Sequence, residues 1–235
     1  MKPNSPDIWY KKPIAYHKTH GMQNPLYPEI KGKFSAPRID NIDVVDPKLK
    51  PIVDLIQIPY KFFGNICGNK NEILMDIASG EAHHKPIIYP LFKEIKFYDL
   101  FFQNTFIKKA DVRDIPEEDN SVDTTFCFGT IDVLKYEDQL KALDELKRVT
   151  KRTLVVGNLD KNGLDYINGI MIYKNNTVNP FKVREMDSVT FPELLEEKFD
   201  DITYYQSSDN NGVLEMREGL STRPKSYMNY ALIRL

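Results

Sequence analysis

The sequence predicts an α/β fold, with helices on both faces of a mostly parallel sheet. From residue 71 onward, short apolar runs alternate with segments of helical periodicity, an alternation typical of βαβ units. Four successive runs also end in an aspartate, a glycine or other small residues. Ligands of parallel sheets bind at the carboxyl ends of the strands. We therefore expect a three-layer sandwich with a ligand site along one edge of its sheet.

Seven strands account for the apolar runs, and the last strand is expected to be antiparallel to its neighbours. They are predicted near residues 72–77, 95–99, 106–110, 124–129, 153–157, 201–206 and 227–235. Helices are predicted over 139–149, where apolar residues recur every three positions between charges, and over 191–199. Pro86 and Pro90 follow the first strand and restrict the next helix to a short one, with Pro86 in its first turn.

Residues 1–70 differ in character from the rest of the chain. Prolines and aromatic residues are scattered there without long periodicity, which indicates an irregular arm packed on the main domain and not a separate domain. A short helix is expected after Asp46, which can cap it, with Pro47 in its first turn. We thus assign 1–70 to an arm or lid and 71–235 to the ligand-binding part of the same domain.

The composition is that of a soluble globular protein, with 41% hydrophobic and 28% charged residues. A net charge of −2 gives no sign of the basic surface that duplex nucleic acids attract, so no nucleic-acid partner is expected. Neither a transmembrane helix nor a secretory signal is expected. Cys67 and Cys127 lie in apolar surroundings, which is typical of free thiols in a cytoplasmic protein, and no metal site is expected.

The predicted strand ends carry Asp76 with Gly80, then Asp99, Asp111 and Gly129. Small residues after the first strand let the backbone approach a ligand closely. A carboxylate ending the second strand can accept hydrogen bonds from two ribose hydroxyls, and one after the third can accept from an adenine amine. A glycine ending the fourth leaves room where a cofactor meets its substrate. Each acid could singly be a solvated loop residue, but four such positions at successive strand ends indicate a site.

Over about residues 71–160 the chain resembles the class I S-adenosylmethionine-dependent methyltransferases. The segment from Ile73 to Ala82, Ile-Leu-Met-Asp-Ile-Ala-Ser-Gly-Glu-Ala, is similar to the family's first motif, an aspartate followed by a glycine-rich turn. Further motifs correspond to 96–99, to 110–116 with 119–123, to 124–134 and to 140–151. The spacing of these pieces carries the resemblance, since none of them is specific alone.

The resemblance implies a Rossmann-like fold and S-adenosylmethionine as the cofactor. Asp99 would hold the ribose, and Asp111 with the backbone amide of the next residue would hold the adenine. The implied cofactor-binding residues are Asp76, Ala78, Ser79, Gly80, Glu81, Asp99, Leu100, Asp111, Val112, Phe128 and Gly129.

The turn after the first strand departs from the family pattern. Ala78 and Ala82 stand where glycine is usual, and an alanine there is tolerated if its φ is negative but costs energy if φ is positive. His83 and His84 follow the turn directly. A histidine in such a place is either structural or exposed, or else it lines the pocket near the methionine end of the cofactor.

Methyl transfer requires the acceptor, the methyl group and the sulfur to be aligned with water excluded, and a hydroxyl acceptor benefits from a base. His17 and His20 are candidates, because the aromatic-rich segment 8–30 can fold over the strand ends as a lid. The alternative is that they lie in a surface loop. Asp132 is a third candidate, just past the fourth strand end, and its alternative role is to cap a helix.

The predicted function is transfer of a methyl group to oxygen or nitrogen of a small polar metabolite, such as a sugar or nucleotide-sugar. The sequence Phe-Gly-Thr-Ile at 128–131 lacks the Asn/Asp-Pro-Pro-aromatic motif of enzymes that methylate nucleic-acid bases or protein glutamine. A second hypothesis is a catalytically degenerate, methyltransferase-like binding or regulatory subunit. A nicotinamide-dependent dehydrogenase is disfavoured because the GxGxxG turn is missing.

Overall fold

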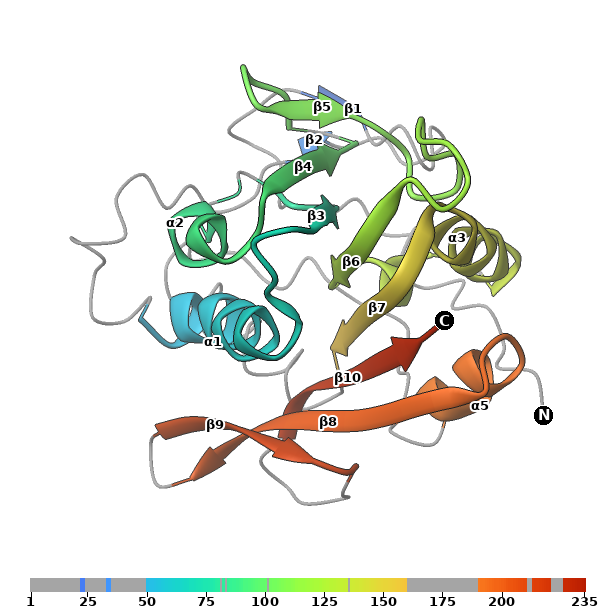
Figure 1. Cartoon of the computed structure of the whole chain (residues 1–235). Coiled ribbons are helices and arrows are strands. Elements are labelled where there is room, and N and C mark those ends of the chain that lie inside the picture. Colours follow the sequence, from blue (N-terminus) through green and yellow to red (C-terminus); the bar gives the residue numbers. More distant parts are fainter. Residues whose placement is uncertain are drawn as a thin grey trace.

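The computed structural model contains one large sheet with helices on both of its faces (Figure 1). It describes residues 22–23, 33–34, 50–80, 82, 84–100, 102–134, 136–159, 190–210, 213–220 and 226–235. The N-terminal arm is described only in part. Two short strands, β1 (Met22–Gln23) and β2 (Lys33–Phe34), pair antiparallel within it, and the predicted cap at Asp46 lies outside the described residues.

The main sheet has eight strands. In spatial order they are β5 (Ile107–Lys109), β4 (Glu94–Asp99), β3 (Ile73–Ile77), β6 (Val122–Phe128), β7 (Thr150–Leu159), β10 (Ser226–Arg234), β8 (Asp201–Asn210) and β9 (Val213–Glu218). The first five are parallel to one another, and β10 is antiparallel to both β7 and β8. All seven predicted strands and the antiparallel last strand are confirmed.

The eighth strand, β9, was not predicted. It pairs antiparallel with β8, which is longer than the predicted strand 201–206. The prediction treated residues 207–226 as a long connection between the last two strands. The dipeptide Asn211-Gly212 is a hairpin signal that could have indicated the pair.

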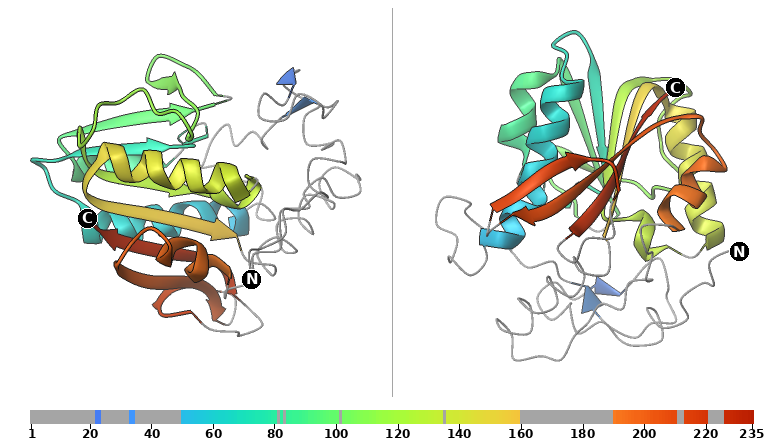
Figure 2. Two further views of the ribbon diagram at one scale, coloured as in Figure 1. Left: turned by 90° about the vertical axis from the view of Figure 1, so that its right-hand side faces the viewer. Right: turned by 90° about the horizontal axis from the view of Figure 1, so that it is seen from below.

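The helices form the two outer layers. They are α1 (Lys50–Cys67), α2 (Lys85–Ile88), α3 (Tyr136–Val149) and α5 (Thr190–Glu196), with the 3-10 turns η3 (Tyr89–Leu91) and η4 (Ile131–Val133). Figures 1 and 2 show α1 and α2 on one face of the sheet and α3 and α5 on the other. The short helix α2 has Pro86 in its first turn, as predicted. No described helix is long and apolar enough to span a lipid bilayer.

The first helix, α1, is the element that departs most from the expectation. It has 18 residues and contains Pro59, whereas a short helix near Pro47 was predicted. It ends at Cys67, and the Gly68 amide donates a last helical hydrogen bond to the Gly64 carbonyl at 2.8 Å. Gly64 itself lies against the Leu91 side chain after α2, so the missing Cβ lets these two helical segments approach. The helix also contacts β9, which explains why the hairpin folds back over this face.

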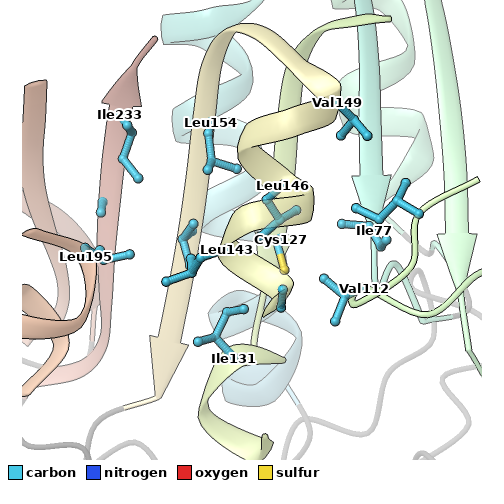
Figure 3. Close-up of a cluster of buried hydrophobic side chains, with 14 of the residues drawn as sticks. Ile77, Val112, Cys127, Ile131, Leu143, Leu146, Val149, Leu154, Leu195 and Ile233 are labelled. Atoms are coloured by element: carbon cyan, nitrogen blue, oxygen red, sulfur yellow. The ribbon is translucent and has the colours of Figure 1, made fainter. Parts of the chain in front are cut away.

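Two buried clusters fill the spaces between the layers. Alternate residues of the strands contribute to opposite faces: Val156 of β7 packs on the α3 side, and Val155 packs on the α1 side. Figure 3 shows the α3 cluster, in which Leu143 and Leu146 of that helix lie over Cys127. Both faces of the central strands are buried, as expected for parallel strands between helical layers.

In the buried cluster between the sheet and α1 (the α1 cluster), which includes Tyr230 and against which Phe128 packs, we expect Gly157→Ala to destabilise the fold. A Cβ at residue 157 would lie 2.8 Å from the rings of Phe128 and Tyr230, which cannot both move in a packed core. We expect a loss of about 1–3 kcal/mol in the free energy of unfolding, measured by denaturant titration. Gly64→Ala is the matched control, since its Cβ meets the end of the Leu91 side chain and alanine favours the helix by about 1 kcal/mol. Equal stability of Gly157→Ala and the wild type would contradict this packing.

Candidate functional site

The site is assembled from the segments that follow β3, β4, β5 and β6 at one edge of the sheet. The turn after β3 is left-handed at three residues: φ is 62° at Ala78, 57° at Gly80 and 52° at Ala82. Both alanines therefore adopt the conformation that carries a cost, and the energetic penalty considered from the sequence is present.

Hydrogen bonds tie this turn to the end of β4. The amide of Ser79 donates to the Tyr98 carbonyl at 3.0 Å, and the amide of Gly80 donates to Asp99 Oδ2 at 2.9 Å. Asp99 Oδ1 accepts from the amide of Phe102 at 3.0 Å. The Asp99 side chain is thus held at the end of its strand, next to the turn, and the residue is only 5% exposed.

Asp76 of β3 lies beneath the turn in a fully buried cluster. Its Oδ1 accepts a hydrogen bond from the Tyr60 hydroxyl of α1 at 3.0 Å, and its Oδ2 lies 2.5 Å from His84 Nε2. The Tyr60 and His84 rings stack with centroids 3.4 Å apart. Burial and the adjacent Asp76 hold the pKa of Tyr60 well above its usual range, so its hydroxyl stays protonated and donates.

Asp111, which follows β5, is engaged by a neighbouring side chain. Arg113 binds it in a bidentate manner, with Nε to Oδ1 at 3.0 Å and Nη2 to Oδ2 at 2.7 Å, and also pairs with Asp138 of α3. Burial alone would raise the pKa of Asp111, but the hydrogen bonds and charge of Arg113 outweigh it and lower that pKa. An adenine amine would therefore have to share this carboxylate with Arg113.

A glycine, Gly129, which has no Cβ, follows the end of β6. Gly129 has a φ of 66°, and its amide donates to the Gly157 carbonyl of β7 at 2.9 Å. Asp132 follows in η4 and is 1% exposed. Burial, together with Asp76 and Asp132, raises the pKa of the Cys127 thiol, which is consistent with an unreactive free cysteine.

Two observations fit an adenosine cofactor at this edge. A Cβ built on Gly80 or on Gly129 would meet no heavy atom within 4 Å, so there is space beside both residues. The buried Ser79 hydroxyl has no hydrogen-bond partner within the described part of the chain. A ligand hydroxyl or amine could complete it. The residues present therefore fit the group that the sequence motifs imply.

The structure brings most of the predicted cofactor residues to one edge. Leu100 and Phe128 are half-buried there, and Val112 is buried. Glu81, His17, His20 and His83 lie outside the described residues, so the catalytic assignments stay predictions. Among the described residues, no group of three or more His, Cys, Asp or Glu could hold a metal ion.

Sequence reasoning missed Tyr60 and Arg113. Tyr60 lies sixteen residues before Asp76 in a helix with no motif of its own, so nothing local connects the two. Arg113 could have been found, since an arginine two residues after an aspartate can reach its carboxylate. His84 is buried against Asp76 and Tyr60, so it is not an exposed histidine.

Arg113→Met tests the electrostatics of Asp111. Because the burial remains and the counter-charge is lost, we expect the pKa of Asp111 to rise above its ordinary value, as followed by NMR titration of the carboxyl group. In the wild type the lowered pKa contributes stability that is present above the unfolded-state pKa and is lost as pH falls through the folded-state pKa. The variant should lose this contribution. Arg217→Met, which breaks an exposed pair with Glu215, should leave the Asp111 titration unchanged.

Comparison with known proteins agrees with this geometry. The family model described as "Methyltransferase domain" matches residues 92–154. No curated protein matches the chain. Among solved structures, a SAM-dependent methyltransferase from Thermotoga maritima, described as a possible histamine N-methyltransferase, has a TM-score of 0.54 at 16% identity, over 80% of this chain and 99% of that one.

Two further structures share the fold. A SAM-dependent methyltransferase from Archaeoglobus fulgidus has a TM-score of 0.54 at 14% identity, over 77% of this chain and 94% of its own. Magnesium protoporphyrin IX methyltransferase from Synechocystis, with bound SAM, has a TM-score of 0.52 at 11% identity, over 83% and 88%. These similarities concern the fold. The chain has the fold of S-adenosylmethionine-dependent methyltransferases, and its residues 92–154 match the methyltransferase-domain model.

Proposed function

We propose that the chain transfers the methyl group of S-adenosylmethionine to oxygen or nitrogen of a small polar metabolite. The observation that carries the cofactor part is the hydrogen bond from the Gly80 amide to Asp99, because it brings the turn after β3 against the acid that ends β4. Bound there, the cofactor supplies an activated methyl group on a positively charged sulfur. The task of the protein is then to position both reactants and to exclude water.

The described residues have separate roles in this proposal. Asp99, whose carboxylate accepts from the amides of Gly80 and Phe102, is assigned to the ribose hydroxyls. Asp111 and the backbone of Val112 face the adenine. The amides and the Ser79 hydroxyl of the turn lie near the methionine end. Gly129 leaves the space in which the acceptor approaches.

The acceptor is proposed to be a sugar, a nucleotide-sugar or a comparable polar metabolite. A net charge of −2 argues against a nucleic-acid acceptor. The descriptions of two structural neighbours name small molecules: one is a possible histamine N-methyltransferase, and the other is magnesium protoporphyrin IX methyltransferase. The buried thiol of Cys127 and the raised pKa of Cys67, about 12, fit a cytoplasmic protein with unreactive cysteines.

Residues 1–70 are proposed to belong to the same domain as 71–235, and acceptor recognition is assigned to their segment 8–30, treated as a lid. The residues at the described strand ends are assigned to the cofactor, so the contacts to the acceptor have to come from another segment. Within the lid, His17 and His20 are the proposed bases, with Asp132 as the third candidate. The burial of Asp132 makes it the weakest of the three, because a base must reach the proton that it removes.

A second candidate function is a degenerate, methyltransferase-like binding or regulatory subunit. Two observations favour it. The Asp111 carboxylate is already bound by Arg113, and Ala78 and Ala82 of the turn have left-handed backbone. Both features would weaken cofactor binding. A thermal-shift panel with S-adenosylmethionine, S-adenosylhomocysteine and NAD separates the two functions, since a ligand that binds only the native state raises Tm. No shift with either adenosyl compound would reject the enzyme.

Asp99→Asn tests the cofactor assignment. Losing the charged acceptor should weaken S-adenosylhomocysteine binding by about 1–3 kcal/mol, as measured by calorimetry. Asp114→Asn is the matched control, because it makes the same chemical change at an exposed residue three positions from Asp111. Unchanged affinity in Asp99→Asn would remove this residue from the site.

His20→Ala tests the lid. If His20 removes the acceptor proton, its loss should lower the methyl-transfer rate by roughly 10²–10⁴-fold while the affinity for S-adenosylhomocysteine stays the same. His17→Ala, measured in parallel by mass-spectrometric detection of methylated acceptor, shows which of the two acts. Full activity of both variants would shift the search for a base to Asp132.

A further inference from the structure

The turn between β3 and α2 contains backbone that its own sequence disfavours. Ala78 and Ala82 have φ values of 62° and 52°, in the left-handed region where a Cβ clashes with the following carbonyl. Such conformations persist where the surrounding structure over-determines them. Something in the fold must therefore offset the cost at these two positions.

The backbone hydrogen bonds of the turn do not by themselves explain it. The Ala82 amide donates to the Ser79 carbonyl and the Lys85 amide donates to the Ala82 carbonyl, both at 3.0 Å. Glycine at 78 and 82 would allow the same bonds without the Cβ penalty. These hydrogen bonds are compatible with the turn, but they do not explain why alanine occupies its left-handed positions.

A side-chain contact joins the two ends of the turn. Asp76 precedes it and His84 follows it, and Asp76 Oδ2 lies 2.5 Å from His84 Nε2 across eight residues of chain. Tyr60 covers the pair from α1, with its hydroxyl on Asp76 Oδ1 and its ring 3.4 Å from the His84 ring, tilted by only 5°. Together they fix the distance that residues 77–83 must span.

The Asp76–His84 pair is buried, and burial makes it a poor means of stabilising the fold. Asp76 is 0% exposed and His84 is 2% exposed, within the α1 cluster that includes Phe97 and Phe126. A buried ionisable pair is often no better for stability than apolar residues of similar volume, and its best-attested use is to specify one arrangement over others. The left-handed turn lies between Asp76 and His84 in the sequence, so it is the arrangement that this pair would specify.

We infer that Asp76, His84 and Tyr60 form a clamp that holds Ala78 and Ala82 in the left-handed region, in place of the freedom that glycine would give. The clamp residues are positioning residues: they act on the cofactor by fixing the turn that carries the Ser79 hydroxyl and the hydrogen bond from Gly80 to Asp99. The part of this inference that concerns ligand affinity rests on the proposed function, whereas the part that concerns the turn itself does not.

The test is a double-mutant cycle between the clamp and the turn. His84→Phe keeps a ring for stacking on Tyr60 but removes the hydrogen bond to Asp76. It is made in the wild-type turn and in a turn carrying Ala78→Gly and Ala82→Gly. The measurements are Tm of the ligand-free protein, hydrogen exchange of the amides at 79–82, and Kd for S-adenosylhomocysteine.

With alanines in the turn, we expect His84→Phe to speed exchange of these amides and to raise Kd by about tenfold or more, a coupling of the size found between contacting residues. With glycines in the turn, the same substitution should change exchange and Kd by less than about threefold. His84→Gln, which retains a donor near the Nε2 position, should lie close to wild type. Asn120→Gly relieves another left-handed residue, at φ 52°, and should not rescue His84→Phe.

Equal effects of His84→Phe in both turns, on exchange and on Tm, would overturn the clamp and leave a structural pair. If His84→Phe does not fold, Tyr60→Phe, which removes only the hydroxyl contact with Asp76, replaces it in the same cycle. If wild type fails to bind S-adenosylhomocysteine, the proposed function fails, but the exchange and Tm cycle of the ligand-free protein still decides on the clamp.

Discussion

The contact between the Gly80 amide and Asp99 fixes how the ends of β3 and β4 meet, and the rest of the site depends on it. Parallel pairing of β3 with β4 and with β6 sets the three strand ends side by side, but pairing alone leaves their loops free to diverge. The amide donates to a carboxylate that also accepts from Phe102, so one nearly buried side chain organises the loops after two strands. A charged acceptor makes both hydrogen bonds stronger than neutral ones.

The sequence was sufficient to predict the layers and the mostly parallel sheet because these follow from local patterns. The spacing of apolar residues along the chain distinguishes buried strands from amphipathic helices, as in α3, where Leu143 and Leu146 face the core. The strand-end acids could be predicted for the same reason: they lie where a strand stops. The extra strand β9 could not be identified in this way, because half of its residues are charged and it gains its stability from β8 and α1.

The contacts inside the site were beyond prediction because they join residues distant in the chain. Nothing near Tyr60 indicates that its hydroxyl meets Asp76, and the sequence could not decide the sign of φ at Ala78. The two questions are physically linked, since the conformation of a short turn depends on what holds its ends. Local propensity alone would have favoured a right-handed alanine, and tertiary contacts override it.

The two outer strands of the sheet bear on how the protein behaves at high concentration. An unpaired strand edge is a template for pairing with another chain. At one side, β5 is only three residues long and carries the exposed Lys108 and Lys109. At the other, the long strand β8 is covered by β9, which exposes Arg217 and Glu218. Short, charged borders of this kind resist edge-to-edge aggregation, so the hairpin that the family motifs do not require protects the ten-residue strand β8 from self-association.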